Sequence, residues 1–98
     1  MKDLNSYRQE IDLIDDQIRQ LFLTRMEIVG EVAKIKMNEE LTVYDHKREE
    51  EIISSNLSKI TDDLFKDYYK EVLEQIMKVS KDYQKYLIIR STLWDTSI

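Results

Sequence analysis

Cationic side chains interrupt the apolar stripe of a long predicted helix. Arg25 occupies an apolar position between Leu21 and Ile28, and Lys36 lies on nearly the same face, roughly 16 Å further along the axis. An unpaired guanidinium is costly to bury, so Arg25 needs a carboxylate partner from the protein or from a ligand. Two cations on one inward face predict a small anion pocket. The alternatives are an ion pair with another helix for Arg25 and a solvated helix end for Lys36.

Polar side chains also lie on the inward face of a later helix and at the start of a short one. Ser80 and Gln84 are four residues apart among apolar neighbours. A buried Ser is satisfied by a backbone carbonyl, whereas a buried Gln has two donors and an acceptor to satisfy. Asp45, Arg48 and Glu49 open the short helix, where a cap and a surface ion pair are the alternative to a binding role. Together these residues predict a polar cavity inside an all-helical core.

Arg8 stands apart from the other candidates. It precedes Arg25 by seventeen residues, which is roughly 25 Å along one helix. The two side chains therefore cannot meet on one small ligand within a single chain. In an antiparallel dimer, however, the start of one first helix reaches the middle of the other. A solvent-facing Arg8 beside Glu10 or Asp12 is the alternative.

The composition excludes several classes of site and partner. The 98 residues contain no Cys and a single His, His46, which excludes disulfides, thiolate chemistry and a His-rich zinc site. A net charge of −5 argues against binding to nucleic acid or to an anionic membrane. The sequence has neither an apolar run long enough to span a bilayer nor a signal peptide, so we expect a cytoplasmic protein.

Regular apolar spacing predicts the helices that position these side chains. With no proline and one glycine, Gly30, almost nothing in the sequence opposes helix, so the fold class is all-α. Spacings of three and four predict a long first helix over about residues 4–37, capped by Asp3. Its stripe consists of Leu4, Tyr7, Ile11, Ile14, Ile18, Leu21, Ile28, Val32 and Ile35.

The rest of the chain is predicted to add a short helix and a second long one. Residues 38–44 form a connector, and Asp45 caps a helix that ends near residue 57. The second long helix covers about residues 62–90. Its stripe consists of Phe65, Tyr69, Val72, Ile76, Tyr83 and Leu87. The period is lost over residues 91–98, which predicts a tail or the start of a linker.

The length of the first helix predicts an assembly. Its 34 residues extend roughly 50 Å, whereas a compact domain of this size is roughly 30–35 Å across. Two further helices cannot cover the whole stripe. A second copy of the chain is the economical cover, so we expect an extended homodimer.

These motifs resemble the all-helical class of chorismate mutase. The resemblance lies in YRQEIDLIDDQIRQLFLTRMEIVGEVAKIK, in VYDHKREEEII and in the late Ser-x-x-x-Gln, and it makes residues 1–90 a chorismate mutase-like domain. It implies an intertwined homodimer of three-helix chains that converts chorismate to prephenate in aromatic amino-acid biosynthesis. No cofactor or metal is implied. The domain is often part of a larger bifunctional enzyme, so a fused or associated aromatic-pathway enzyme is a possible partner.

The resemblance also implies a role for each candidate residue that meets a carboxylate or the ether oxygen. Arg25 matches the arginine that holds a substrate carboxylate within the site, and Arg8 matches the one that reaches a carboxylate from the partner subunit. Lys36 and Gln84 match the two donors on the ether oxygen. Ser80 matches a serine near the ring carboxylate.

The remaining candidates match the part of the site that recognises the ring hydroxyl. Glu49, with Arg48 and the region of Asp45, corresponds to that group. The connector departs from the family pattern, because Thr42 stands where a proline is often found before the valine. This departure changes the stiffness of the loop and involves no candidate catalytic residue.

Three other functions stay open at this stage. An isochorismate-pyruvate lyase has the same fold, but such lyases tend to lack the glutamate that Glu49 matches. A regulatory module would bind chorismate or prephenate without turnover. A plain helical dimerisation domain would tolerate apolar replacements at Arg25, Lys36 and Gln84, and it leaves these polar residues unexplained.

Overall fold

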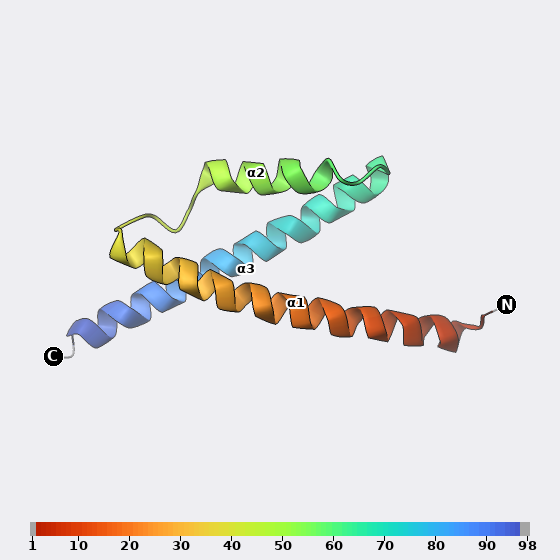
Figure 1. The fold of residues 1–98 in the computed structure, drawn as a ribbon, viewed down its shortest axis with the longest axis horizontal. Coiled ribbons are helices and arrows are strands. Elements are labelled where there is room, and N and C mark those ends of the chain that lie inside the picture. The colour runs from red at the N-terminus through yellow and green to blue at the C-terminus, as the bar shows by residue number, and fades with distance from the viewer. Residues whose placement is uncertain (1, 97–98) are drawn as a thin grey trace.

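The computed structural model describes residues 2–96 as three helices joined by short connectors (Figure 1). The order is α1 (Leu4–Asn38), α2 (His46–Leu57) and α3 (Asp63–Thr96). Within these residues there is no strand. The prediction of an all-α chain with a long, a short and a second long helix is confirmed.

Aspartate side chains set the starts of α1 and α2. The Asp3 carboxylate accepts a hydrogen bond of 2.8 Å from the Ser6 amide, and Asp45 accepts one of 3.0 Å from the Arg48 amide. Each bond satisfies one of the first-turn amides that have no partner within the helix. Both predicted caps are therefore confirmed. After α1 the chain turns at Glu40, which has a positive φ of 56°.

The end of α3 differs from the sequence prediction. The helix continues to Thr96, six residues past the predicted end at residue 90. The apolar period fades over this stretch, but no Gly or Pro interrupts it, so the backbone continues its helical hydrogen bonding. Residues 91–96 are therefore helical. Residues 97 and 98 of the predicted tail lie outside the described part of the chain.

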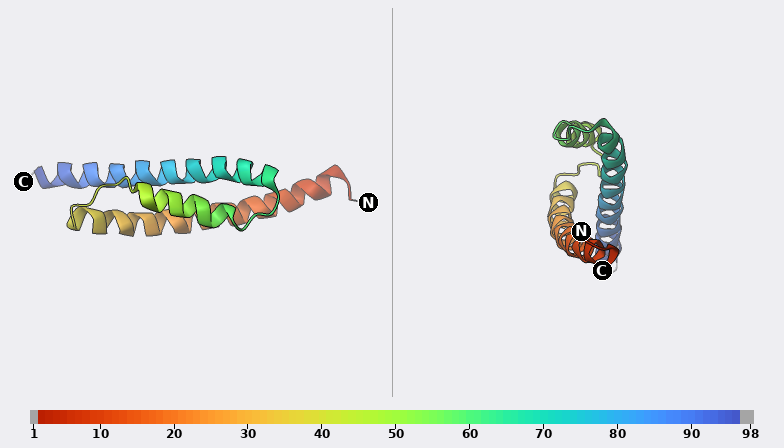
Figure 2. Two further views of the ribbon diagram at one scale, coloured as in Figure 1. Left: turned by 90° about the horizontal axis from the view of Figure 1, so that it is seen from above. Right: turned by 90° about the vertical axis from the view of Figure 1, so that its right-hand side faces the viewer.

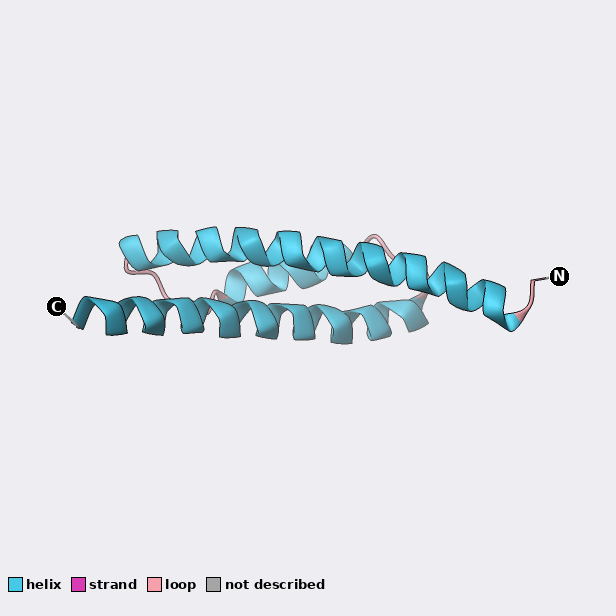
Figure 3. Cartoon of the chain, turned by 90° about the horizontal axis from the view of Figure 1, so that it is seen from below, coloured by secondary structure: helices cyan, strands magenta, loops and turns pink. Residues whose placement is uncertain are grey.

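The three helices form an open and elongated arrangement. α1 and α3 run in the same general direction and cross, while α2 runs back beside the first half of α3 (Figures 1 and 2). α3 packs against both other helices. The N-terminal half of α1 projects away from them (Figure 1), and its first turns extend past the start of α3 (Figure 3). The radius of gyration is 17.8 Å, against about 13 Å for a compact domain of similar length.

The core of a single chain is small and lies at the crossing of α1 and α3. Val29 and Ala33 of α1 and Leu73 and Met77 of α3 are its buried apolar residues. Gly30 is also buried there and lies against α3. No described helix is apolar over a length sufficient to cross a bilayer.

The apolar stripe of α1 is left largely uncovered by α2 and α3, as its length predicts. The first six residues of the stripe are between 50 and 70% exposed. They are Leu4, Tyr7, Ile11, Ile14, Ile18 and Leu21. The later members Ile28 and Ile35 are also exposed, because α1 meets α3 through Val29, Gly30 and Ala33 instead.

Candidate active site

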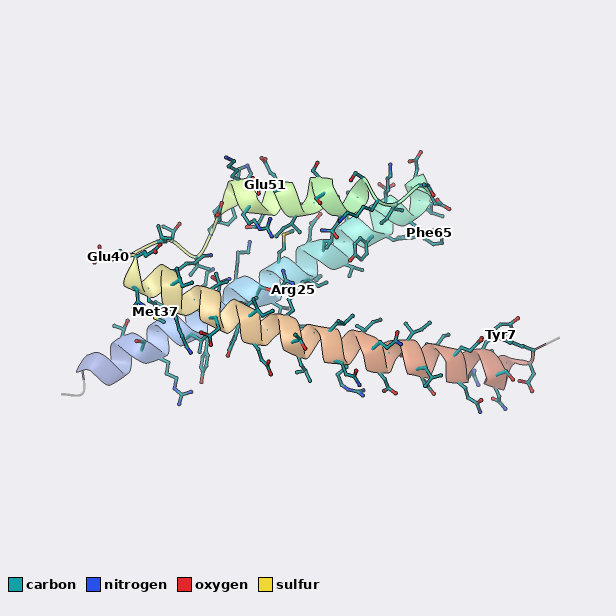
Figure 4. The ribbon with its side chains drawn as sticks, in the orientation of Figure 1. Tyr7, Arg25, Met37, Glu40, Glu51 and Phe65 are labelled. Atoms are coloured by element: carbon teal, nitrogen blue, oxygen red, sulfur yellow. The ribbon has the colours of Figure 1, made fainter. Side chains whose placement is uncertain are left out.

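A cavity of about 170 Å³ lies where the second half of α1, the start of α2 and the middle of α3 meet. Its apolar lining consists of Val29, Val32, Val43, Ile52 and Met77. Its polar lining consists of Arg25, Lys36, Asp45, Arg48, Glu49, Ser80, Lys81 and Gln84. Seven of the eight candidate residues chosen from the sequence thus line one cavity. Figure 4 shows Arg25 in the region where α1 meets α3.

Arg25 is joined to α3 by a neutral hydrogen bond. Its Nη1 donates to the Ser80 hydroxyl, and that hydroxyl donates in turn to the carbonyl oxygen of Ile76 at 2.8 Å. Among the described residues, the guanidinium forms no ion pair with a carboxylate. The half-buried positive charge of Arg25 is therefore oriented by the protein without being neutralised. A ligand carboxylate is the natural partner for such a group.

Gln84 supplies a buried amide to the same wall of the cavity. Its side chain is buried, and its Oε1 has no hydrogen-bond partner among the described residues. An amide left unsatisfied in this way costs free energy of about 1–3 kcal/mol. Because the oxygen and nitrogen exchange places on rotation of the amide, Gln84 can present either a donor or an acceptor to a ligand.

Lys36 joins the end of α1 to the connector that precedes α2. Its Nζ donates a hydrogen bond of 2.8 Å to the carbonyl oxygen of Val43. The ammonium retains further donors, and its side chain is half-buried at the cavity wall. Both cations predicted from the stripe of α1 therefore face one cavity.

The start of α2 contributes three charged residues with different surroundings. Asp45 is engaged as the cap, and Arg48 is exposed and lies 3.7 Å from Glu51. Glu49 is half-buried and lies beside Lys81 of α3, whose Nζ is 3.2 and 3.3 Å from its two carboxylate oxygens. Of these side chains, Glu49 is the one held by another helix.

Lys81 is the polar cavity residue that the sequence reasoning missed. The available signal was its position four residues after Met77, which places it one turn further along the edge of the buried face. That signal is weak, because lysines at the edges of buried faces usually extend into solvent. The pairing of Lys81 with Glu49 requires the register of α2 against α3, which the sequence does not reveal.

The cavity carries a positive charge within an acidic chain. Four cationic side chains and two carboxylates line it, an excess of two positive charges, whereas the whole chain has a net charge of −5. Such a local reversal of sign concentrates anions at the cavity. It favours a ligand with two negative charges.

Arg8 lies outside this cavity. It is exposed on the projecting half of α1, seventeen residues before Arg25 and so roughly 25 Å from it along the helix. A single chain therefore does not bring Arg8 to the other candidates, as the sequence predicts.

Comparison with known protein families identifies the chain. The family model described as chorismate mutase type II matches residues 7–85, which include every polar residue of the cavity. The chain belongs to the chorismate mutase type II family. The resemblance read from the sequence motifs is thereby confirmed at the level of the family.

Two individual proteins are similar to the chain, one in sequence and one in both sequence and structure. The chain is 32% identical over 81 residues to the T-protein of Haemophilus influenzae, a match that covers 82% of the chain and 22% of that protein. A solved structure of a conserved hypothetical protein from Pyrococcus furiosus is 38% identical. It superposes with a TM-score of 0.69 over 83% of this chain and 93% of the other.

Proposed function

We propose that the chain is a chorismate mutase, which rearranges chorismate to prephenate in the cytoplasm. The observation that carries this proposal is the cavity between the three helices. It combines an excess of two positive charges with an oriented but unneutralised Arg25 and a buried, unsatisfied Gln84. Chorismate carries two carboxylates, so its charge complements that of the cavity. Membership of the chorismate mutase type II family supports the same assignment.

The reaction requires positioning and electrostatic stabilisation. One C–O bond of the ether breaks while a C–C bond forms within the same molecule, so no nucleophile, base or external group takes part. Arg25, oriented by Ser80, holds one carboxylate and thereby favours the compact conformer in which the reacting carbons meet. Lys36 and Gln84 donate to the ether oxygen, on which negative charge grows in the transition state. Glu49 accepts from the ring hydroxyl.

The active form in this proposal is an intertwined homodimer. Support comes from the six residues at the start of the stripe, which are at least half exposed along the projecting half of α1. A second copy would cover them and would place its own Arg8 at the cavity, where Arg8 would meet the second carboxylate. The Leu21→Glu variant is expected to sediment as a monomer, because it puts a charge into this apolar stripe.

A matched variant controls the test of assembly. Leu23 is also an exposed leucine of α1, but it lies on the opposite side of the helix from the stripe. The Leu23→Glu variant should therefore keep the mass of the wild type in light scattering. A monomeric wild type, or equal dissociation of both variants, would contradict a dimer built on the stripe.

We also propose that the chain acts together with another enzyme of aromatic amino-acid biosynthesis, fused to it or associated with it. The support is the relation to the T-protein, of which the chain spans under a quarter. Co-purification of a second aromatic-pathway activity with the tagged chain from its own cells would test this association. Recovery of the mutase alone would count against it.

The catalytic assignment is tested by turnover of chorismate. We expect the wild type to convert chorismate to prephenate. The loss of chorismate absorbance measures the rate. Arg25→Ala should lower the rate by about 10²–10³-fold, because an oriented charge at the reacting ligand is lost. Arg19→Ala is the matched control, since Arg19 is exposed on the same helix and pairs with Asp16 at 2.9 Å. Absence of turnover, or equal effects of both variants, would refute the assignment.

A further inference from the structure

Lys81 is a cavity cation that the family resemblance does not assign to any role. It lies on α3 and pairs with Glu49 of α2. The two side chains are only 27 and 21% exposed, whereas those of the other ion pairs in residues 2–96 are between 37 and 97% exposed. This ion pair is therefore the most shielded from solvent in the described part of the chain, and shielding strengthens it.

The Lys81 ammonium has two neighbouring groups that can hold it in place. Nζ lies 3.2 and 3.3 Å from the two carboxylate oxygens of Glu49, so it bridges both. It also lies 5.0 Å from the centre of the Tyr44 ring, within the range of a cation–π interaction. Tyr44 belongs to the connector that precedes α2. Lys81 thus connects three segments of the chain at the wall of the cavity.

We propose that Lys81 is a positioning residue that holds the Glu49 carboxylate ready to accept a hydrogen bond from a hydroxyl of the substrate. A carboxylate has about four lone-pair sites, and an ammonium that bridges the two oxygens leaves the outer ones free. Without Lys81, no other described side chain pairs with the Glu49 carboxylate, which is then free to rotate. Lys81 therefore acts through Glu49 and contributes to the selection of a hydroxylated substrate. This inference rests on the proposed mutase function.

The test is a double-mutant cycle on turnover of chorismate with Lys81→Met, Glu49→Gln and the double variant. We expect Lys81→Met alone to lower kcat/KM roughly tenfold, which is within the usual coupling of a contacting pair. In the Glu49→Gln background the same change should cost less than about twofold, because the group that it positions is gone. Lys81→Arg should recover part of the activity, since it restores a cation next to Glu49.

Two further measurements separate positioning from a general loss of structure. Lys78→Met is the matched control, because Lys78 pairs with Asp82 at 2.9 Å on the exposed side of the same helix, and it should leave kcat/KM unchanged. A chorismate analogue whose ring hydroxyl is methylated should be handled equally by wild type and Lys81→Met. A variant that had lost its fold would instead lose activity with both substrates and would show a lowered melting temperature.

The outcomes distinguish this inference from the proposed function. Equal losses from Lys81→Met in both backgrounds would overturn the positioning role and would indicate direct contact with the substrate. Unchanged kcat/KM in Lys81→Met, or failure of Lys81→Arg to recover activity, would also overturn it while leaving the mutase assignment intact. A wild type that does not convert chorismate would refute the proposed function, and the inference with it.

Discussion

The guanidinium of Arg25 and the hydroxyl of Ser80 form a hydrogen bond that joins α1 to α3 across 55 residues of sequence. The Ser80 hydroxyl donates its proton to the carbonyl oxygen of Ile76, at an O···O distance of 2.8 Å. It must therefore accept the hydrogen bond from Arg25. A neutral acceptor orients the guanidinium and leaves its charge available. This arrangement suits a binding group for a carboxylate better than an ion pair with the protein would.

The first prediction concerns this bond. Ser80→Ala should lower kcat/KM for chorismate roughly 10–100-fold, because a hydrogen bond to a charged group is typically worth about 1.5–3 kcal/mol. Steady-state kinetics at fixed pH measure the change. Ser54→Ala is the control, since Ser54 is exposed on α2. Wild-type kinetics in Ser80→Ala would show that Arg25 needs no orientation by α3.

The second prediction concerns Arg8 and the symmetry of the proposed dimer. Arg8→Ala and Arg25→Ala should each lose nearly all activity alone, as expected for Arg25→Ala above. If each site takes Arg25 from one copy and Arg8 from the other, a mixed dimer has one intact site. Refolding the two variants together in equal amounts should therefore restore about a quarter of the wild-type activity, because half of the dimers are mixed.

The control for this experiment is mixing without unfolding. Folded variants that exchange slowly should stay inactive until they are refolded together. If dimers form on refolding but activity is not recovered, the two arginines of a site come from one chain, or Arg8 is not part of the site.

Helix positions in this chain were predictable because the sequence has no proline and one glycine, so little interrupts the apolar period. The first helix was expected over about residues 4–37 and ends at Asn38, and aspartates cap α1 and α2 as expected. The end of α3 was misplaced, because loss of the apolar period marks the end of a buried face and not the end of a helix. Thr96 is helical although nothing in the pattern requires it.

The polar lining of the cavity was predictable where a polar residue interrupts an apolar face. Arg25, Ser80 and Gln84 are of this kind. Lys81 was missed, because its partner Glu49 lies on another helix and the offset between α2 and α3 is a property of packing. The contact of α1 with α3 through Val29 and Ala33 was missed for the same reason.

The third prediction concerns Gly30, which lies at the crossing of α1 and α3. A Cβ atom there would meet the Tyr83 ring at 3.6 Å and Leu87 at 3.8 Å, both ordinary van der Waals distances. Gly30→Ala should therefore fit, and it should raise the free energy of unfolding by about 1 kcal/mol through helix propensity. Urea denaturation at fixed protein concentration measures this change.

Ala33→Gly is the matched reversal at a neighbouring buried position of the same helix. Ala33 is fully buried, so the change removes both helix propensity and a packed methyl group, and it should destabilise the fold by at least as much. A lower urea midpoint for Gly30→Ala than for the wild type would show that the helices cannot accept the added methyl group.

The fourth prediction concerns the pH dependence of the start of α1. The hydrogen bond from the Ser6 amide lowers the pKa of the Asp3 carboxyl from its ordinary value. A pKa depressed in the folded state means that the cap contributes fully above the unfolded value and loses its contribution as pH falls through the folded one. Protection of the first-turn amides of α1 from hydrogen exchange, measured relative to the intrinsic rate at each pH, should therefore fall below about pH 4.

Asp3→Asn separates this titration from capping itself. Asparagine caps about as well as aspartate but has no carboxyl to protonate. The variant should keep the wild-type protection factors at neutral pH and should not lose protection as the pH falls. An Asp3 carboxyl that titrates by NMR at its unfolded value would contradict the prediction.

The projecting half of α1 also has a consequence for how the protein is made. α1 precedes α3 in the chain, so at about 5–20 residues per second its apolar stripe is outside the ribosome for roughly 3–10 s before α3 is complete. Such an exposed surface favours aggregation with unrelated nascent chains. Neighbouring ribosomes on one messenger RNA supply identical stripes at high local concentration. Pairing during translation would therefore protect the surface that a finished chain leaves uncovered.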